Sequence, residues 1–319
     1  MSITEIIKNQ DFFKNIVEKK ENNTLSNAIL FFCDDNFTNQ KVLILTALML
    51  EYQTTFDLFN EDSAEFKKIE SGVDLDVKIY PKNNEKLLVA DSNEIVAECF
   101  IKPVNLPYKI FVVNNFGSST EEAQNKLLKV LEEPPANVFF LLGASSEERV
   151  LPTIKSRCDK VKILPLAAEE ICQITDISLA QILGGGYIGK TLALAKNDNL
   201  NMLVEFGVSL LTQLKNSKQV LRFSKKILEE KEHLPLILEV VSLCIEDIIK
   251  LKCESEHLCK LTRFVDDLRD VEPEFSVESL CEISKLISRL REKIEFNANL
   301  TVAVDNFLLK MLEVKYLCK

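Results

Sequence analysis

Eight residues of the chain match a phosphate-binding pattern. The stretch GGGYIGKT, residues 184–191, fits G-x-x-x-x-G-K-[ST], and its fixed places are taken by Gly184, Gly189, Lys190 and Thr191. In a phosphate loop a buried strand leads into a helix N-terminus, so that backbone N–H groups and the helix dipole converge on the phosphate. The preceding stretch DISLAQIL instead has its apolar residues at helical spacing. We therefore favour a glycine turn between two helices, and an autonomous nucleotide site that uses Lys190 is the alternative.

A second candidate is a metal site in the stretch CESEHLC, formed by Cys253, His257 and Cys259. Tetrahedral zinc takes four ligands, and no second short-spaced pair supplies the fourth. The chain has nine cysteines, an odd number, and none forms a C-x-x-C pair. Such a pattern is typical of reduced thiols in a cytosolic protein. We predict no metal site.

The charge of the chain opposes autonomous binding to nucleic acid. A total of 39 Lys and Arg against 49 Asp and Glu gives a formal net charge of -10, whereas affinity for nucleic acid comes largely from cations that neutralise phosphates. One basic stretch, KNSKQVLRFSKK, contains Lys215, Lys218, Arg222, Lys225 and Lys226. We interpret it as a solvated helix face.

The N-terminal residues MSITEIIKNQDFF have neither a basic start nor an apolar signal core, and no apolar run has the length of a membrane span. A cytoplasmic protein is therefore expected.

The first half of the sequence alternates apolar extended runs with helical ones. Strands are predicted at 27–32, 76–81, 109–114, 138–145 and 160–164. Several of these runs are apolar on both faces, as in a buried parallel sheet. Residues 119–135 predict a helix that begins at a capping box of Ser119 and Glu122 and ends at Pro134 and Pro135. A strand, a helix and a strand at this length form a βαβ crossover, which predicts an α/β fold.

After Pro165 the pattern is helical to the end of the chain. Two apolar stripes repeat every three or four residues, one made by Leu280, Ile283, Ile287, Leu290 and Ile294 and one by Leu300, Val304, Phe307, Leu308 and Met311. Such stripes form either the internal core of a helical bundle or a collar between subunits. Periodicity does not separate the two interpretations.

The turn after the first strand, where a doubly wound sheet carries its phosphate loop, lacks the residues for that task. The stretch FFCDDNFTNQ has no glycine, and Asp34 and Asp35 would repel a phosphate. The third strand ends in Asn114 and Asn115, which carry no charge to hold Mg²⁺. The predicted architecture is that of a nucleotide-binding fold in which both chemical positions are empty.

The stretch AQNKLLKVLEEPPANVFFLLGASSEERVLPTIKSRC, residues 123–158, strongly resembles the core of bacterial clamp-loader subunits of the AAA+ class. The resemblance extends over residues 6–166 and is specific, because LEEPP is followed within about 25 residues by SRC. It implies a RecA-like AAA+ domain with a parallel sheet at 1–165, a small helical lid at 166–200 and a helical collar or oligomerisation domain at 201–319.

Within that resemblance, Asn39 and Gln40 occupy the places where an active phosphate loop has Lys and Thr. Lys190 lies at the lid element called sensor 2, where active subunits carry an Arg, and Ser145 stands near sensor 1. The resemblance implies that this chain binds no cofactor of its own. The ATP and Mg²⁺ would be held by the neighbouring subunit.

Ser156, Arg157 and Cys158 match the SRC motif of the same family. The resemblance implies that Arg157 reaches in trans to the nucleotide of the neighbouring motor subunit, as an arginine finger does. The alternative is an Arg157 paired locally with an acid such as Asp159. Cys158 is interpreted as a packed thiol, because only His233 and His257 exist and neither is near it in sequence.

The function that the resemblance implies is that of a non-hydrolysing stator of a clamp loader. Its expected partners are the gamma/tau motor subunit, the delta subunit and, through the assembly, the sliding clamp and primed DNA. Many relatives hold a zinc module after the first helix of the sheet domain, but residues 52–72 contain no cysteine. We therefore expect that module to be absent or replaced. A protein-interaction scaffold of the same fold is the remaining rival.

Overall fold

The computed structural model describes residues 2–52, 55–82, 86–295 and 298–317. The chain divides into two compact units. Unit 1 is Met1–Asp176 with Gly184–Ala193, and unit 2 is Ile177–Leu183 with Leu194–Lys319. The glycine-rich segment therefore packs with the N-terminal unit, although the residues on both sides of it belong to unit 2. The three-part division at 165 and 200 stays a prediction.

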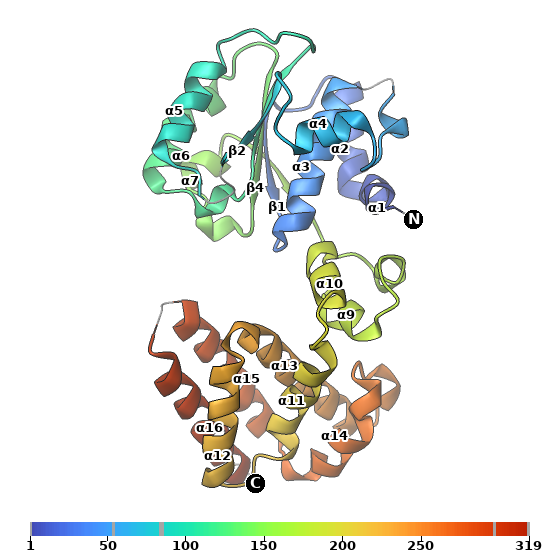
Figure 1. Ribbon diagram of the computed structural model, residues 1–319, viewed down its shortest axis with the longest axis vertical. Coiled ribbons are helices and arrows are strands. Elements are labelled where there is room, and N and C mark those ends of the chain that lie inside the picture. The colour runs from blue at the N-terminus through green and yellow to red at the C-terminus, as the bar shows by residue number, and fades with distance from the viewer. Residues whose placement is uncertain (1, 53–54, 83–85, 296–297, 318–319) are drawn as a thin grey trace. The chain divides into compact units, whose positions relative to one another are not determined.

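Unit 1 contains a five-stranded parallel sheet (Figure 1). Its strands are β1 (Ala28–Phe32), β2 (Val77–Tyr80), β3 (Lys109–Val113), β4 (Val138–Ala144) and β5 (Asp159–Lys162). The order across the sheet is β2-β3-β4-β1-β5, and every pair is parallel. β1, β3 and β4 are buried at every residue, as the continuous apolar runs predict. The predicted fold class, an α/β parallel-sheet domain followed by helices, is confirmed.

Helices cover both faces of the sheet. One face carries α1 (Ile3–Asn9), α2 (Asp11–Glu21), α3 (Asn36–Glu51) and α4 (Ala64–Glu70). The other carries α5 (Val89–Glu98), α6 (Glu121–Glu132) and α7 (Pro152–Lys155). Alternate residues of β1 follow this division, because Ile29 and Phe31 pack with the first set and Leu30 with the second. Unit 1 also contains α8 (Ala168–Ile171) and the first six residues of α10 (Ile188–Ala195).

The predicted start of α6 is wrong by one residue. Thr120, not Ser119, is the N-cap, and its hydroxyl accepts a hydrogen bond of 3.2 Å from the N–H of Ala123. Ser119 has a different task, because its hydroxyl donates to the carbonyl of Phe116 and ends the short turn that precedes the helix. Ser119 alone has a Glu three residues later, but both hydroxyl residues are of the types that cap helices, and the path of the chain selects Thr120.

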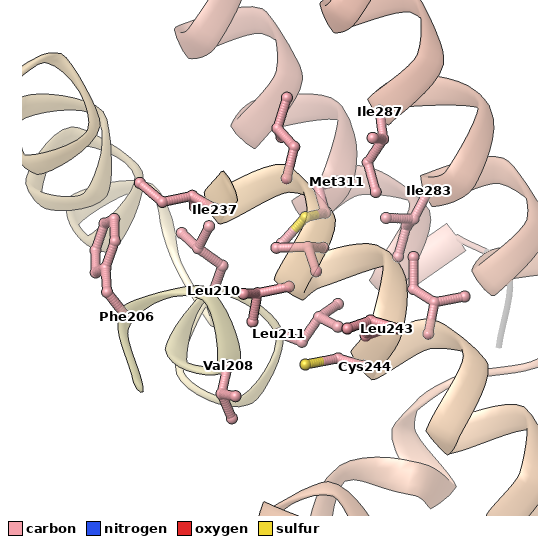
Figure 2. Close-up of a cluster of buried hydrophobic side chains, with 14 of the residues drawn as sticks. Phe206, Val208, Leu210, Leu211, Ile237, Leu243, Cys244, Ile283, Ile287 and Met311 are labelled. Atoms are coloured by element: carbon pink, nitrogen blue, oxygen red, sulfur yellow. The ribbon is translucent and has the colours of Figure 1, made fainter. Parts of the chain in front are cut away.

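Unit 2 is helical throughout its described residues. Its helices are α9 (Ser178–Leu183), α11 (Leu200–Thr212), α12 (Ser217–Glu229), α13 (Leu234–Lys252), α14 (Val265–Val271), α15 (Val277–Glu295) and α16 (Leu300–Leu317). Figure 2 shows residues of the core, where Leu210 and Leu211 of α11 lie near Leu243 of α13 and Met311. The helices α11 and α13 approach closely at Gly207, where an added Cβ would lie 2.6 Å from Cγ1 of Val240.

The two apolar stripes belong to this internal core. Leu280, Ile283, Ile287 and Leu290 of α15 are buried, as are Val304, Phe307, Leu308 and Met311 of α16. The two helices pack against each other, and α16 also packs against α12. These residues therefore form the bundle core, the first of the two interpretations.

Candidate functional site

Asp35 closes the turn between β1 and α3, at the place where a nucleotide-binding fold holds phosphate. It is the N-cap of α3, and its Oδ2 accepts a hydrogen bond of 3.3 Å from the N–H of Thr38 and another from the Thr38 hydroxyl. The same oxygen accepts a bond of 2.7 Å from the N–H of Gly189, at the start of α10. The carboxylate is buried, with 8% of the residue exposed. A fixed anion of the chain thus occupies the electropositive helix terminus.

Lys190 reinforces the same contact. Its Nζ lies 2.8 Å from Oδ2 of Asp34 and 4.6 Å from the ring centroid of Tyr187. Gly189 is required here, because an added Cβ would lie 2.4 Å from Oδ1 of Asp35 and 2.5 Å from Cβ of Phe37. The glycine and lysine of the phosphate-loop pattern therefore bind the two aspartates.

The rest of the GGGYIGKT stretch is not built as a phosphate loop. The helix α9 precedes it, so the strand that such a loop needs is missing, as predicted. Gly185 and Gly186 have φ angles of 59° and 83°, which fit a turn between helices. Thr191 is 0% exposed, so its hydroxyl is not available to a metal ion.

Asn39 points into the protein. It is buried in α3, and its Nδ2 donates a hydrogen bond of 3.2 Å to the carbonyl of Ala144 at the end of β4. Gly143 allows this approach, since an added Cβ would lie 2.9 Å from Oδ1 of Asn39. The neighbouring Gln40 is half-buried. Asn39 therefore ties α3 to the sheet where an active loop would direct a lysine towards phosphate.

The end of β3 provides no carboxylate. Asn114 is half-buried and its N–H donates a bond of 2.8 Å to the carbonyl of Tyr80. Asn115 adopts a left-handed conformation with φ 50°, which suits asparagine, and leads into the next turn. Ser145, just past β4, is also half-buried. The residues predicted at the nucleotide positions thus gather at the carboxyl edge of the sheet, where β3 ends in two amides and the carboxylates are those of Asp34 and Asp35 in the β1–α3 turn.

Cys33, at the same edge, is not a nucleophile. It is buried, and its burial raises the pKa of the thiol to about 12, with further increases from the charges of Asp35 and Asp34. A thiol with such a pKa stays protonated near neutral pH. The turn therefore contains two carboxylates and one inert thiol.

We expect Asp35→Ala to lower the free energy of unfolding of unit 1 by about 2 to 3 kcal/mol, because it removes a helix cap and leaves the buried N–H of Thr38 and the partly buried N–H of Gly189 unpaired. Faster amide hydrogen exchange across residues 184–193 should accompany the loss. Asp34→Ala is the matched control, since it removes only an exposed ion pair worth about 1 kcal/mol or less. Equal exchange in the two variants would contradict the role given to Asp35.

Arg157 lies just after α7 and pairs with Glu132, the last residue of α6. Its Nη2 and Nε lie 2.9 Å and 3.0 Å from Oε2 of Glu132, and its Nη1 donates to the carbonyl of Thr153 at 2.9 Å. The side chains are 30% and 57% exposed. The acid expected in the alternative, Asp159, pairs with Lys19 instead, at 3.0 Å. The sequence did contain a signal for this pairing, because Glu132 belongs to the LEEPP stretch and the SRC stretch that contains Arg157 follows it in sequence.

The two neighbours of Arg157 are structural. The Ser156 hydroxyl donates to the carbonyl of Thr153 at 3.1 Å. Cys158 packs against the core beneath α6, and its burial raises the pKa of the thiol to about 12. The interpretation of Cys158 as a packed thiol agrees with that burial.

One of the three candidate ligands in CESEHLC, Cys259, lies beside the buried Asp247, and its Sγ is 3.8 Å from the carbonyl oxygen of that residue. Asp247 of α13 is 0% exposed, and its oxygens accept bonds of 2.7 to 3.0 Å from the N–H groups of Lys260 and Leu261. Cys259 is buried beneath them, whereas Cys253 is exposed. Within the described ranges, no group of three or more His, Cys, Asp and Glu side chains is arranged to hold a metal ion. Asp247 thus organises this loop through backbone hydrogen bonds.

Comparison with known proteins assigns the part of the chain that contains the parallel sheet to one family. The model of the family described as DNA polymerase III, delta subunit, matches residues 8–167. DNA polymerase III subunit delta' from Escherichia coli is 36% identical over 100 residues, which are 28% of this chain and 30% of that protein. The delta' subunit from Haemophilus influenzae is 45% identical over 83 residues, 26% of this chain and 24% of that protein.

DNA polymerase III subunits named gamma are also similar to this chain. DNA polymerase III subunit gamma from Buchnera aphidicola is 32% identical over 105 residues, 33% of this chain and 29% of that protein. A gamma subunit-related protein from Thermotoga maritima has a solved structure that covers 95% of this chain and 98% of its own, with 20% identity and a TM-score of 0.44. The chain spans less than a third of the length of the Escherichia, Haemophilus and Buchnera subunits. None of the helices in the described parts of the chain is long and apolar enough to cross a membrane.

Proposed function

The chain belongs to the DNA polymerase III delta-subunit family, and we propose that it is the delta-prime type of clamp-loader subunit, a stator that does not hydrolyse ATP. In this role it supplies Arg157 to the ATP site of a neighbouring motor subunit. Its partners in the assembly are the gamma/tau motor subunit and the delta subunit. Through the assembly it contributes to loading a sliding clamp on primed DNA.

The observation that carries the proposal is the filled phosphate position. The N–H groups that open α3 and α10 are directed at the carboxylate of Asp35, with distances of 3.3 Å and 2.7 Å. A nucleotide phosphate would have to displace this anion and also approach the exposed Asp34. Repulsion between like charges opposes both steps. The position that would require a lysine holds Asn39, which bonds to β4.

The same contacts support the stator role. A subunit that cycles with ATP needs its lid segment to respond to the bound nucleotide, whereas here Gly189 and Lys190 bond to residues of the β1–α3 turn. Neither contact depends on a nucleotide, because both partners of each contact belong to this chain. The segment is thereby held in one arrangement, and we propose that the chain keeps this arrangement while the neighbouring subunits change.

Arg157 has the chemistry for the role in trans. A guanidinium stays charged and can donate two parallel N–H bonds to phosphate oxygens. In this chain it bonds to Glu132 at the surface, where an ion pair contributes about 1 kcal/mol or less. Arg157 can therefore leave Glu132 and bind a phosphate instead at a small cost in free energy. The pairing also orients the side chain before the neighbour arrives.

The isolated chain is expected to give no saturable heat of Mg-ATP binding by titration calorimetry up to roughly 1 mM, and no increase in its melting temperature. The Lys190→Ala variant should behave in the same way as the wild type. A P-loop ATPase measured in parallel is the positive control. Tight Mg-ATP binding that Lys190→Ala abolishes would overturn the proposal in favour of an autonomous nucleotide site.

A further inference from the structure

The helix α12 has a strongly basic exposed face. Its buried residues Val220, Phe223, Ser224 and Ile227 face the bundle, where α12 packs against α16. The opposite face exposes Lys218, Arg222, Lys225 and Lys226. Arg222 is four residues from Lys218, three from Lys225 and four from Lys226, so it neighbours each of the three lysines on the helix surface. Lys215 precedes the helix and is exposed as well.

Most of these charges lack a strong acidic partner. Lys215 and Lys225 make only long pairs, with N–O distances of 3.7 Å to Glu274 and 3.9 Å to Glu229. Among the residues that the structure describes, Lys218, Arg222 and Lys226 make no ion pair. Like charges three or four residues apart destabilise a helix by about 0.2 to 0.5 kcal/mol for each pair. The positive side chains on the exposed face of α12 therefore repel one another, and close acidic partners do not offset this repulsion.

The helix dipole adds to this positive potential. The first turn of α12 contains no acidic residue but contains Lys218, and Lys215 precedes the N-cap. Because the N-terminal end of a helix is itself positive, it favours anions and disfavours cations. Lys215 and Lys218 therefore place cations at the end of α12 that by itself attracts anions, in a chain whose net charge is -10.

A shallow hollow of about 220 Å³ lies beside this face, between α11 and α12. Arg222 and Lys226 line it, and Nζ of Lys226 lies 4.4 Å from the ring centroid of Phe206. Glu205 is its one acidic lining residue, and its carboxylate is already paired with Arg263 at 3.1 Å. The hollow therefore keeps its cationic character.

We propose that the exposed face of α12 binds the phosphodiester backbone of a nucleic acid. Backbone contacts in such complexes are made largely by Lys and Arg. A protein partner is less well suited, because lysine is depleted at protein interfaces and aromatic residues are enriched, whereas this face exposes lysines. The overall negative charge of the chain makes the contact weak and strongly dependent on salt.

The experiment measures fluorescence anisotropy of a labelled oligothymidylate of about 30 nucleotides, and of a duplex of the same length, with the full chain at low salt. With four contacts to a single strand, the logarithm of the binding constant should fall with a slope of about -3 against the logarithm of salt. The variant Lys218→Glu/Arg222→Glu should bind at least about tenfold more weakly, with a shallower slope. The two probes distinguish single-stranded from duplex nucleic acid.

The matched control is Lys126→Glu/Lys129→Glu, which makes the same change of net charge on exposed positions of α6 in unit 1. Circular dichroism melting checks that both variants fold. An equal loss of affinity in both variants, or no binding by the wild type at low salt, would overturn the proposal. Preference for polyglutamate over the oligonucleotides would overturn it as well and would indicate an acidic protein partner. None of these measurements uses ATP hydrolysis. A negative result would therefore overturn the nucleic-acid contact of α12 without overturning the proposed function.

Discussion

Replacing Arg157 with alanine in the reassembled clamp loader is expected to slow hydrolysis at the neighbouring ATP site by about 10³-fold or more, as removal of an arginine finger does in other nucleotide hydrolases. The physical reason is the loss of a fixed positive charge that stabilises the transferring phosphoryl group. The measurement is clamp-stimulated ATP turnover at matched complex assembly. Arg157→Lys should restore little, because an ammonium cannot donate two parallel bonds from one planar group.

Two control variants separate this role from a structural one. Lys155 is the last residue of α7, two residues before Arg157, and its Nζ bonds to the carbonyl of Glu147, so Lys155→Ala tests local disturbance. Glu132→Gln removes the acid that pairs with Arg157 and leaves the guanidinium in place. Both variants should keep the turnover of the wild type within a few-fold. Unchanged turnover in Arg157→Ala, with the complex intact, would instead favour the scaffold interpretation.

The sheet could be predicted from the sequence because its signal is local. Strands such as β3 and β4 are continuous apolar runs, and each lies within two residues of its expected bounds. The same holds for the stripes of α15 and α16, where the three-and-four spacing marks the buried face. In each case the side-chain pattern of one segment is enough to indicate its burial, on both sides of β3 and β4 and on one face of α15 and α16.

The contacts that define the candidate site could not be predicted in this way. Asp35 and Gly189 are 154 residues apart, and the sequence indicated only that aspartates would repel phosphate, not that one would bind the lid segment. Arg157 and Glu132 are 25 residues apart, and the alternative of a local ion pair had pointed to the nearer Asp159. Selection among several carboxylates depends on tertiary geometry, about which periodicity carries no information.

Glu51, the last residue of α3, is a buried acid that the sequence pattern also did not single out. It is 8% exposed, and neither of its carboxylate oxygens accepts a hydrogen bond of ordinary geometry from the described residues. Burial raises its pKa to about 8, and the charges of Asp76 and Asp74 add to the increase. Those two aspartates are themselves held by backbone N–H groups, Asp74 at 2.8 and 3.0 Å and Asp76 at 2.7 to 3.0 Å.

The stability of unit 1 is therefore expected to fall as the pH rises. In the native state Glu51 keeps its proton up to about pH 8, whereas in the unfolded chain it loses the proton near pH 4.3. Between these values the native state binds more protons, so the free energy of unfolding decreases by up to about 1.4 kcal/mol per pH unit. The total is at most about 5 kcal/mol, and the stabilisation is fully present only below the lower value.

The variant Glu51→Gln should remove this dependence and raise the free energy of unfolding at about pH 8. An amide of the same shape carries no charge to desolvate, although its own hydrogen-bond groups still lack partners, so the gain should be smaller than the full effect. Urea denaturation at several pH values between about 5.5 and 8 measures it, with Glu21→Gln at an exposed position of α2 as the control. A Glu51→Gln curve parallel to that of the wild type would mean that Glu51 ionises without difficulty in the folded protein.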